Sequence, residues 1–249
     1  MNILVFDTET TSINKPFCYN VGYCIVDTTT KETLVERDFV VEQIWHNLPL
    51  FATAYYAEKR PLYIASLRTR KSIMEKWGKI MQILKKDIAT YKVESAYAYN
   101  SPFDDGVLAM NNDWFRTNNP LETIPIHDIR GYAHHFIVND DYKKFCDKHG
   151  LYTEAGNYST TAEAIYKYLI DETFVEEHTA LADSKIEKDI LLECLDRGAL
   201  IDTDYPVYNS IERIVTKNFK VVDKRNGTEH DFEYEKIFIN KEKTKAILK

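Results

Sequence analysis

Apolar and polar positions follow one another in blocks that predict strands at the start of the chain. Residues 3–6 are four consecutive apolar residues, a pattern typical of a strand buried on both faces. Segments 21–26 and 34–41 are also apolar and β-branched, and the polar link 27–32 between them suits a hairpin loop. We therefore expect the chain to begin with three strands.

Helical spacing of apolar residues begins after a mixed segment. Apolar residues recur at helical intervals over 73–88, and Ser72 with Glu75 would form a capping box at the start of that helix. A longer helix is expected over 186–195, ending near Gly198.

Two short helices are expected between these long ones. One covers 140–148 and is stopped by Gly150. The other begins at Thr160, where Glu163 completes a second capping box.

The remaining apolar segments predict strands and set the fold class. Segments 95–99 and 124–129 are short strands, and Pro125 favours a strand end or a sheet edge. The tail over 218–240 alternates apolar and polar residues around Asn226-Gly227, a strong hairpin signal. This order of elements predicts an α/β fold with a mixed β-sheet flanked by helices and a C-terminal β-hairpin extension.

Composition limits the class of protein. A chain of 249 residues fits one large domain, or one domain with an appendage. No apolar run reaches the ~18–20 residues that span a bilayer, and no secretory signal begins the chain. We expect no membrane association and a cytoplasmic location, where thiols stay reduced. The four cysteines lack zinc spacing. The formal charge of −7 argues against a protein that grips long duplex DNA through its overall field.

The first strand runs into two acids, Asp7 and Glu9. Residues two apart in a strand share a face, so their carboxylates point the same way at the rim of a core. Such carboxylates repel each other unless a hard cation lies between them. The alternative is a strand that ends in a polar loop, and a second Asp-x-Glu at Asp231 and Glu233 shows that the pattern alone is not specific.

Two further patterns can join these acids. Asn100 precedes Asp104 by four positions where a strand stops, the only such spacing in the chain. His178 precedes Asp183 by five positions at the start of the long helix. The same His-to-Asp spacing at 135 and 140 lies in a less regular stretch.

Together these residues resemble the histidine-bearing DEDD (DEDDh, DnaQ-like) 3′–5′ exonucleases of the RNase H-like superfamily. That branch includes the proofreading subunit of bacterial DNA polymerase III, RNase T and oligoribonuclease. The three family motifs are matched in order by Asp7-Thr8-Glu9-Thr10-Thr11, by Asn100–Asp104 and by His178–Asp183. The third motif looks like that of phage-encoded members, which would place the protein in a host cytoplasm. Ser12 replaces a common glycine, and the approach over 158–177 is long.

The resemblance implies a fold, a reaction and a set of residue roles. It implies an exonuclease domain over 1–204 and leaves a C-terminal extension over 205–249 without a role. It implies a metal-dependent exonuclease that releases nucleoside 5′-monophosphates from single-stranded DNA 3′ ends, with two divalent cations, Mg²⁺ or Mn²⁺. The implied roles are metal ligation by Asp7, Glu9, Asp104 and Asp183, general base catalysis by His178, and substrate binding by Thr10, Asn100 and Phe103.

Several alternatives stay open at this point. The substrate could be RNA or short oligonucleotides, or the fold could be a silent binding module. His178 could merely cap a helix, and Phe103 could be core. The basic clusters Lys59-Arg60 and Arg68–Lys71 could contact phosphates or form a solvated face. A second copy of the chain and a polymerase are partners that the sequence leaves undecided.

Overall fold

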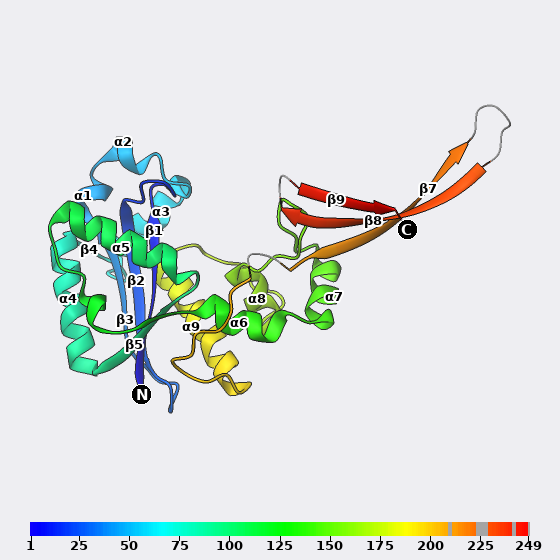
Figure 1. The fold of residues 1–249 in the computed structure, drawn as a ribbon. Coiled ribbons are helices and arrows are strands. Elements are labelled where there is room, and N and C mark those ends of the chain that lie inside the picture. The colour runs from blue at the N-terminus through cyan, green and yellow to red at the C-terminus, as the bar shows by residue number, and fades with distance from the viewer. Residues whose placement is uncertain (209–210, 223–228, 241–242, 249) are drawn as a thin grey trace.

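A six-stranded mixed sheet forms the centre of the fold (Figure 1). The computed structural model describes residues 1–208, 211–222, 229–240 and 243–248. The strand order is β4-β3-β2-β1-β5-β6, and β1 pairs antiparallel with β2 and parallel with β5. The strands are β1 (Asn2–Thr10), β2 (Cys18–Asp27), β3 (Thr33–Val41), β4 (Ile73–Glu75), β5 (Val93–Ala98) and β6 (Ile126–Asp128). The predicted α/β class with a mixed sheet is confirmed.

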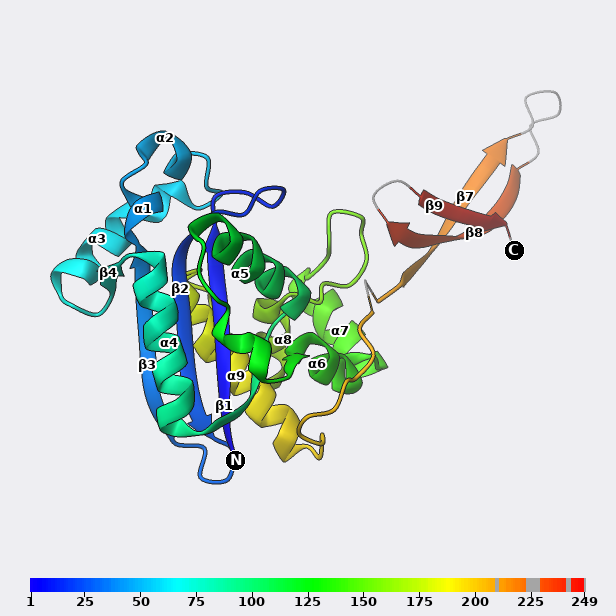
Figure 2. The same ribbon diagram turned by 60° about the vertical axis from the view of Figure 1, so that its left-hand side comes forward.

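Helices cover both faces of this sheet (Figures 1 and 2). Helices α4 and α5 pack on one face, and α9 packs on the other together with α6 and α8. The α-helices are α1 (Glu42–Trp45), α2 (Leu48–Phe51), α3 (Arg60–Arg68), α4 (Trp77–Tyr91), α5 (Ser101–Phe115), α6 (Ile129–Ile137), α7 (Asp140–His149), α8 (Ala162–Leu169) and α9 (Ala180–Asp196). Two short 3₁₀ helices are η1 (Ala57–Lys59) and η2 (Pro120–Thr123).

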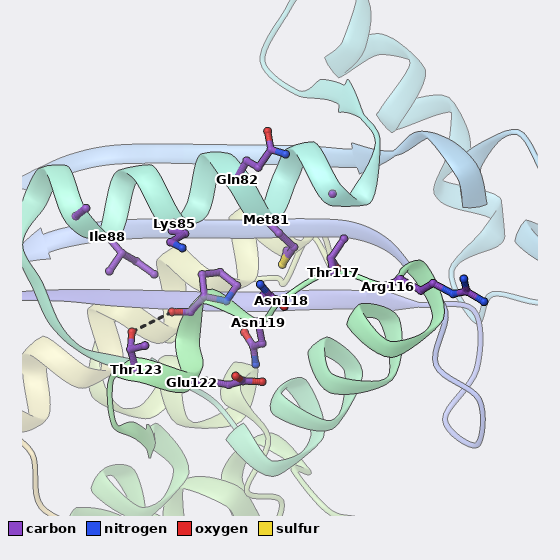
Figure 3. Close-up of a pocket in the computed structure, with 13 residues that line it drawn as sticks. Met81, Gln82, Lys85, Ile88, Arg116, Thr117, Asn118, Asn119, Glu122 and Thr123 are labelled. Atoms are coloured by element: carbon purple, nitrogen blue, oxygen red, sulfur yellow. Dashed lines mark hydrogen bonds between the residues drawn. The ribbon is translucent and has the colours of Figure 1, made fainter.

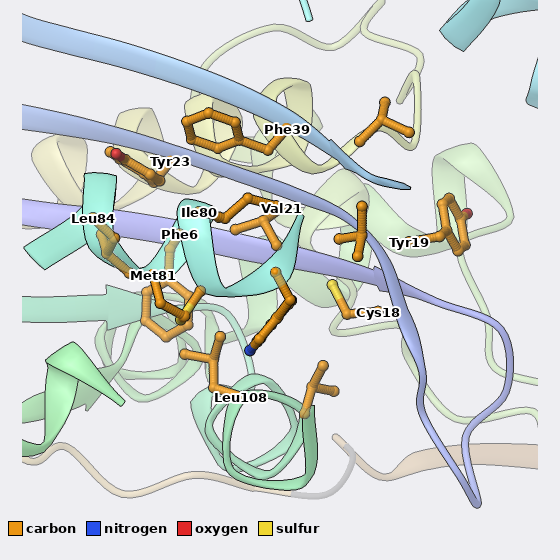
Figure 4. Close-up of a cluster of buried hydrophobic side chains, with 14 of the residues drawn as sticks. Phe6, Cys18, Tyr19, Val21, Tyr23, Phe39, Ile80, Met81, Leu84 and Leu108 are labelled. Carbon is orange, nitrogen blue, oxygen red and sulfur yellow. The ribbon is translucent and has the colours of Figure 1, made fainter. Parts of the chain in front are cut away.

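Strand β1 is apolar on both sides because each side faces a separate core. Leu4 and Phe6 belong to the cluster under α4 and α5, part of which Figure 4 shows. Ile3 and Val5 belong to the cluster under α6, α8 and α9. Alternate residues of a strand point to opposite faces, so an uninterrupted apolar run is required here.

Several local predictions are confirmed. The link 27–32 turns between β2 and β3, with the Asp27 N–H donating to the Glu32 carbonyl at 3.0 Å. Gly150 follows α7 with a left-handed φ of 66°. Strand β6 lies at the sheet edge, as Pro125 suggested.

The two predicted capping boxes are wrong. Residues 73–75 form β4 and pair with β3, because the Ser72 hydroxyl donates to the Asp38 carboxylate instead of capping a helix. Helix α4 starts at Trp77, whose N–H donates to Gln43 Oε1 at 3.1 Å. The cap of α8 is not Thr160 but Thr161, whose hydroxyl accepts from the Ala164 N–H at 3.3 Å.

The mixed segment after β3 forms three short α-helices and the 3₁₀ helix η1, and residues 42–68 are called the insert below. The insert is held by aromatic rings rather than by long amphipathic helices. Trp45 and Tyr63 pack against each other with ring centroids 6.0 Å apart, and Tyr63 meets Tyr19 of β2 at 5.8 Å. This explains why helical periodicity was weak there.

The C-terminal residues form a second sheet of three antiparallel strands. These are β7 (Arg213–Val222), β8 (Glu229–Asn240) and β9 (Lys243–Leu248). The predicted Asn226-Gly227 turn lies outside the described residues. Before this sheet, Tyr205 and Ile211 pack against the core beside α6. The division of the chain at residue 204 stays a prediction.

The last two features of the described residues are the state of the cysteines and the length of the apolar helices. All four cysteines are free and buried. Within the described part of the chain, no helix has the length and apolarity needed to cross a bilayer.

Candidate metal centre and active site

The end of β1 brings Asp7 and Glu9 to the face of the sheet that α9 covers. Both have odd numbers, as do Ile3 and Val5, so strand alternation places them on this face. Asp183 lies in the first turn of α9. One carboxylate oxygen from each of Asp7, Glu9 and Asp183 lies within 4.8 Å of the other two.

Asp104 reaches the same strand end from the first turn of α5. Its Oδ1 accepts hydrogen bonds from the Thr8 N–H at 3.0 Å and the Thr8 hydroxyl at 2.6 Å. Thr8 therefore fixes one oxygen of the Asp104 carboxylate. Burial, followed by charge repulsion from Asp104, raises the pKa of Asp7. All four acids of the proposed ligand set converge from β1, α5 and α9.

Burial and mutual repulsion oppose ionisation of this cluster. Desolvation is the largest cause for every member, and neighbouring carboxylates add to it. The pKa of Glu9 is raised to about 8, that of Asp104 to about 7 and that of Asp183 to about 9. The pKa of Asp7 is raised well above its ordinary value. The four carboxylates cannot all be ionised at neutral pH without a nearby positive charge.

The donor set fits divalent cations. Asp183 is only 8% exposed, and its buried Oδ1 has no hydrogen-bond partner among the described residues. A buried carboxylate oxygen without a donor is costly, and a hard cation satisfies it with the oxygen ligand that Mg²⁺ and Mn²⁺ prefer. Asp7, Glu9 and Asp104 supply the remaining carboxylates.

His178 lies just before α9, in the segment 174–179 that is called the histidine loop below. Its Nδ1 is 3.2 Å from Glu176 Oε2, and its ring stacks on Tyr56 with centroids 4.6 Å apart. Burial, followed by the charge of Lys59, lowers the pKa of His178. A ring nitrogen of His178 and carboxylate oxygens of Glu176 and Asp183 lie within 4.8 Å of one another. The imidazole thus borders the acid cluster.

The start of α9 is fixed directly against β2. Asn20 Oδ1 accepts from the Ala180 N–H at 2.9 Å. A Cβ on Gly22 would lie 2.1 Å from the Ala180 carbonyl carbon, so only glycine allows this approach. These contacts determine the distance of Asp183 from β1.

The three predicted substrate residues lie at the rim of the centre. Thr10 ends β1 where the pairing with β2 shifts register, and its hydroxyl donates to the Ser12 carbonyl at 3.2 Å. Asn100 has a left-handed φ of 65° before α5, and its Oδ1 accepts from Arg130 at 3.2 Å. Phe103 packs against the core while staying partly exposed.

Two acids of this site were missed by the sequence analysis. Glu187 is 4% exposed, and its Oε2 accepts from the Tyr99 N–H at 3.1 Å. It lies one helical turn after Asp183, a spacing that puts both on one face of α9 and could have revealed it. Glu176 precedes His178 by two positions, and burial raises its pKa to about 7.

The alternative motif pairs lie elsewhere. His135 packs against the Tyr205 ring at 4.9 Å, and Asp140 pairs with Lys143 at 3.0 Å on the surface. Arg60 lies over the Trp45 ring at 4.6 Å, so it anchors the insert. Residues 68–71 are exposed, as a solvated basic face would be.

A hollow of about 660 Å³ lies between α4 and the segment 116–123 (Figure 3). Met81 and Ile88 form apolar parts of its wall, and Asn118 and Thr123 contribute polar groups. None of the clustered acids lines it. This hollow is therefore separate from the candidate metal centre.

Comparison with known proteins supports the fold. No family model and no curated protein matches the chain. The nuclease domain of 3′hExo, a DEDDh family member bound to rAMP, matches with a TM-score of 0.56 and 13% identity over 84% of this chain and 97% of that domain. A 3′-exonuclease in 3′-end specific recognition of histone mRNA stem-loop matches with a TM-score of 0.55 and 12% identity, over 92% of this chain and 89% of that one.

E. coli Exonuclease I in complex with a 5cy-dA13 oligonucleotide also matches, with a TM-score of 0.50 and 15% identity. The match covers 79% of this chain but only 41% of Exonuclease I. At these identities the likeness establishes the fold. The chain has the RNase H-like α/β fold of structurally known 3′ exonucleases, as the motif resemblance predicted.

Proposed function

We propose that this protein is a metal-dependent 3′–5′ exonuclease that hydrolyses phosphodiester bonds at single-stranded DNA 3′ ends and releases nucleoside 5′-monophosphates. The observation that carries the proposal is the convergence of Asp7, Glu9 and Asp183, with Asp104 from a third element and His178 beside them. The fold, shared with known 3′ exonucleases, adds independent support.

The four acids would hold two divalent cations, Mg²⁺ or Mn²⁺. When bound, these cations supply Lewis-acid stabilisation of phosphate charge and lower the pKa of the attacking water. Asp7 and Glu9 come from a core strand, and Asp104 and Asp183 from the first turns of helices. Rigid elements therefore set the spacing of the ligands before substrate arrives.

His178 acts as the general base in this proposal. The Glu176 carboxylate next to Nδ1 favours the tautomer in which Nδ1 carries the proton. Nε2 is then the free acceptor that takes a proton from the attacking water. Because the pKa of His178 is lowered, its imidazole stays neutral at pH 7 and can accept that proton.

Substrate contacts are assigned to the rim residues. Arg130 occupies the amide oxygen of Asn100, which leaves the amide N–H groups of Asn100 to donate to a nucleotide. The exposed part of Phe103 offers an aromatic surface for a base, and Thr10 lies where the strand ends beside the acids. Residues 1–204 would form the catalytic domain and 205–249 the extension.

RNA is the second candidate substrate. The two matching structures with the higher TM-scores are described with rAMP and with a histone mRNA stem-loop. Recognition of RNA would require contacts to the 2′-hydroxyl that DNA lacks.

One experiment tests polarity, sugar preference and product class together. Matched DNA and RNA oligonucleotides, labelled at the 5′ end, are incubated with the protein and Mg²⁺ or Mn²⁺, and the products are identified by mass spectrometry. We expect 5′-labelled ladders and nucleoside 5′-monophosphates. Products from the 5′ end, or equal activity in Asp7→Ala, would refute the proposal.

A further inference from the structure

The histidine loop has a backbone conformation that requires outside support. His178 adopts a left-handed φ of 54°, a region that few non-glycine residues occupy, although Asn, Asp and His enter it more often than others. Such a conformation persists only where surrounding contacts hold it. Two supports are local, because Glu176 and the first turn of α9 lie within a few positions of His178 in the chain.

The insert supplies the missing support from a distant part of the chain. Figures 1 and 2 show α1, α2 and α3 at the end of the sheet where β1 ends. The Tyr56 ring stacks on the His178 imidazole, with centroids 4.6 Å apart and an interplanar angle of 15°. A flat stack of this kind restricts rotation of the imidazole out of its plane.

Lys59 holds the backbone next to the histidine. Its Nζ donates to the Glu177 carbonyl at 2.5 Å and lies 4.4 Å from the centroid of the Tyr56 ring. One ammonium group thus contacts both the loop and the ring that stacks on the base. Burial raises the pKa values of Glu9, Glu176 and Asp183, and the charge of Lys59 offsets part of that rise.

The insert is itself anchored, so these contacts are carried by a fixed element. Arg60 lies over Trp45 at 4.6 Å and Phe51 at 5.5 Å, and Tyr63 is fully buried. Tyr19 joins this aromatic cluster and donates from its hydroxyl to Glu9 at 3.4 Å. The insert is therefore connected to Glu9 through Tyr19 of β2 and to the histidine loop through Tyr56 and Lys59.

We propose that Tyr56 and Lys59 are positioning residues that hold the imidazole of His178 beside Asp183 in its reactive orientation. This inference rests on the proposed exonuclease function. It also assigns a role to half of the Lys59-Arg60 pair, since Arg60 anchors the insert while Lys59 contacts the histidine loop.

The test is steady-state hydrolysis of single-stranded DNA at saturating Mg²⁺. The variants are Tyr56→Leu, which keeps apolar volume without a ring, Tyr56→Phe, Lys59→Met and Lys59→Arg. Lys86→Met is the matched control, because Lys86 is an exposed cation on α4, whose C-terminal end contacts the start of β1, whereas the acids lie at the other end of that strand. Each of the Leu and Met changes is also made in a His178→Ala background.

We expect kcat to fall about 10–100-fold in Tyr56→Leu and about 10-fold in Lys59→Met, with KM within about two-fold of the wild type, because misplacement of a base affects the chemical step. Tyr56→Phe and Lys59→Arg should keep kcat within about three-fold. In the His178→Ala background, Tyr56→Leu and Lys59→Met should lower kcat no further, because both substitutions act through His178.

Three results would overturn the inference. One is Lys59→Met with the same kcat as Lys86→Met. Another is a raised KM at unchanged kcat, which would make these residues substrate contacts. The third is a full additional loss in the His178→Ala background. An inactive wild type, or an active Asp7→Ala variant, would instead refute the proposed function, and this inference would fall with it.

Discussion

Raising the pH should destabilise the metal-free protein through its acid cluster. Between pH 7 and pH 9 the carboxyls of the unfolded chain are fully ionised, whereas the folded chain keeps protons on Glu9 and Asp183, with pKa values of about 8 and about 9. The folded state therefore binds more protons, and its stability falls as the pH rises toward those folded-state pKa values. His134, whose pKa is lowered to about 4, affects stability only below pH 6.5, outside this window.

The magnitude follows from the two raised pKa values. A retained proton changes the free energy of unfolding by about 1.4 kcal/mol per pH unit. Glu9 keeps its proton over roughly half of the window and Asp183 over nearly all of it. The summed loss from these two groups is about 4 kcal/mol. For a chain of this size that corresponds to a fall in Tm of about 8–16 °C.

Thermal unfolding at pH 7, 8 and 9, with a chelator or with excess Mg²⁺, measures this effect. Bound cations allow the carboxylates to ionise in the folded state, so Mg²⁺ should raise Tm and flatten its pH dependence. Asp183→Asn should flatten the dependence of Tm on pH that is measured with the chelator. Asp113→Asn, which changes an exposed acid, should leave that dependence unchanged. An equal slope with and without Mg²⁺, or an unchanged slope in Asp183→Asn, would refute the account of the acid cluster.

Four further outcomes are expected. Asp7→Ala should lower exonuclease kcat at least about 1000-fold, as measured with labelled oligonucleotides. It should also raise the Tm measured with a chelator, because it removes a buried carboxyl whose ionisation the neighbouring acids oppose. His178→Ala should lower kcat about 100–10,000-fold while the Mn²⁺-induced Tm shift stays close to wild type; loss of that shift would make His178 a metal ligand. Gly22→Ala should destabilise the fold by about 3 kcal/mol or more in chemical denaturation, because its Cβ would overlap Ala180. Gly106→Ala, in open space on α5, should stabilise it by about 0.5–1 kcal/mol.

The sequence predicted the parts of the fold that depend on local pattern. The apolar run of β1 follows from two cores on opposite sides, and strand alternation alone puts Asp7 and Glu9 on one face. The predicted cap at Ser72 was wrong because a hydroxyl can serve a neighbouring strand as well as a helix end. Here the Ser72 hydroxyl donates to the Asp38 carboxylate. The residues around Ser72 do not indicate this partner, because Asp38 is distant in the sequence.

Those residues of the candidate site that belong to motifs could be predicted from the sequence. Residues that act through contacts with distant parts of the chain could not. Glu187 carries no motif, although its position one turn after Asp183 marks the same helix face. Lys59 contacts Glu177 across 118 positions of the chain, and only the packing of the insert brings the two together. An isolated basic pair predicts neither a solvated face nor a phosphate contact until the fold is known.

The arrangement of the acids also explains why the site is built on three elements rather than one. If all the acids were on β1, neighbouring acids would point to opposite faces of the sheet, and acids two positions apart would repel each other on the same face. Such acids could not surround a cation. Asp104 reaches the cluster because β5 pairs in parallel with β1, so that α5 begins at the end of β1 and Thr8 can bind its carboxylate. Asp183 reaches it because Gly22 lets α9 begin against β2. The convergence of the four acids is therefore a consequence of parallel strand pairing and one close helix–sheet approach, and under the proposed function a change that shifts either should weaken metal binding before it unfolds the chain.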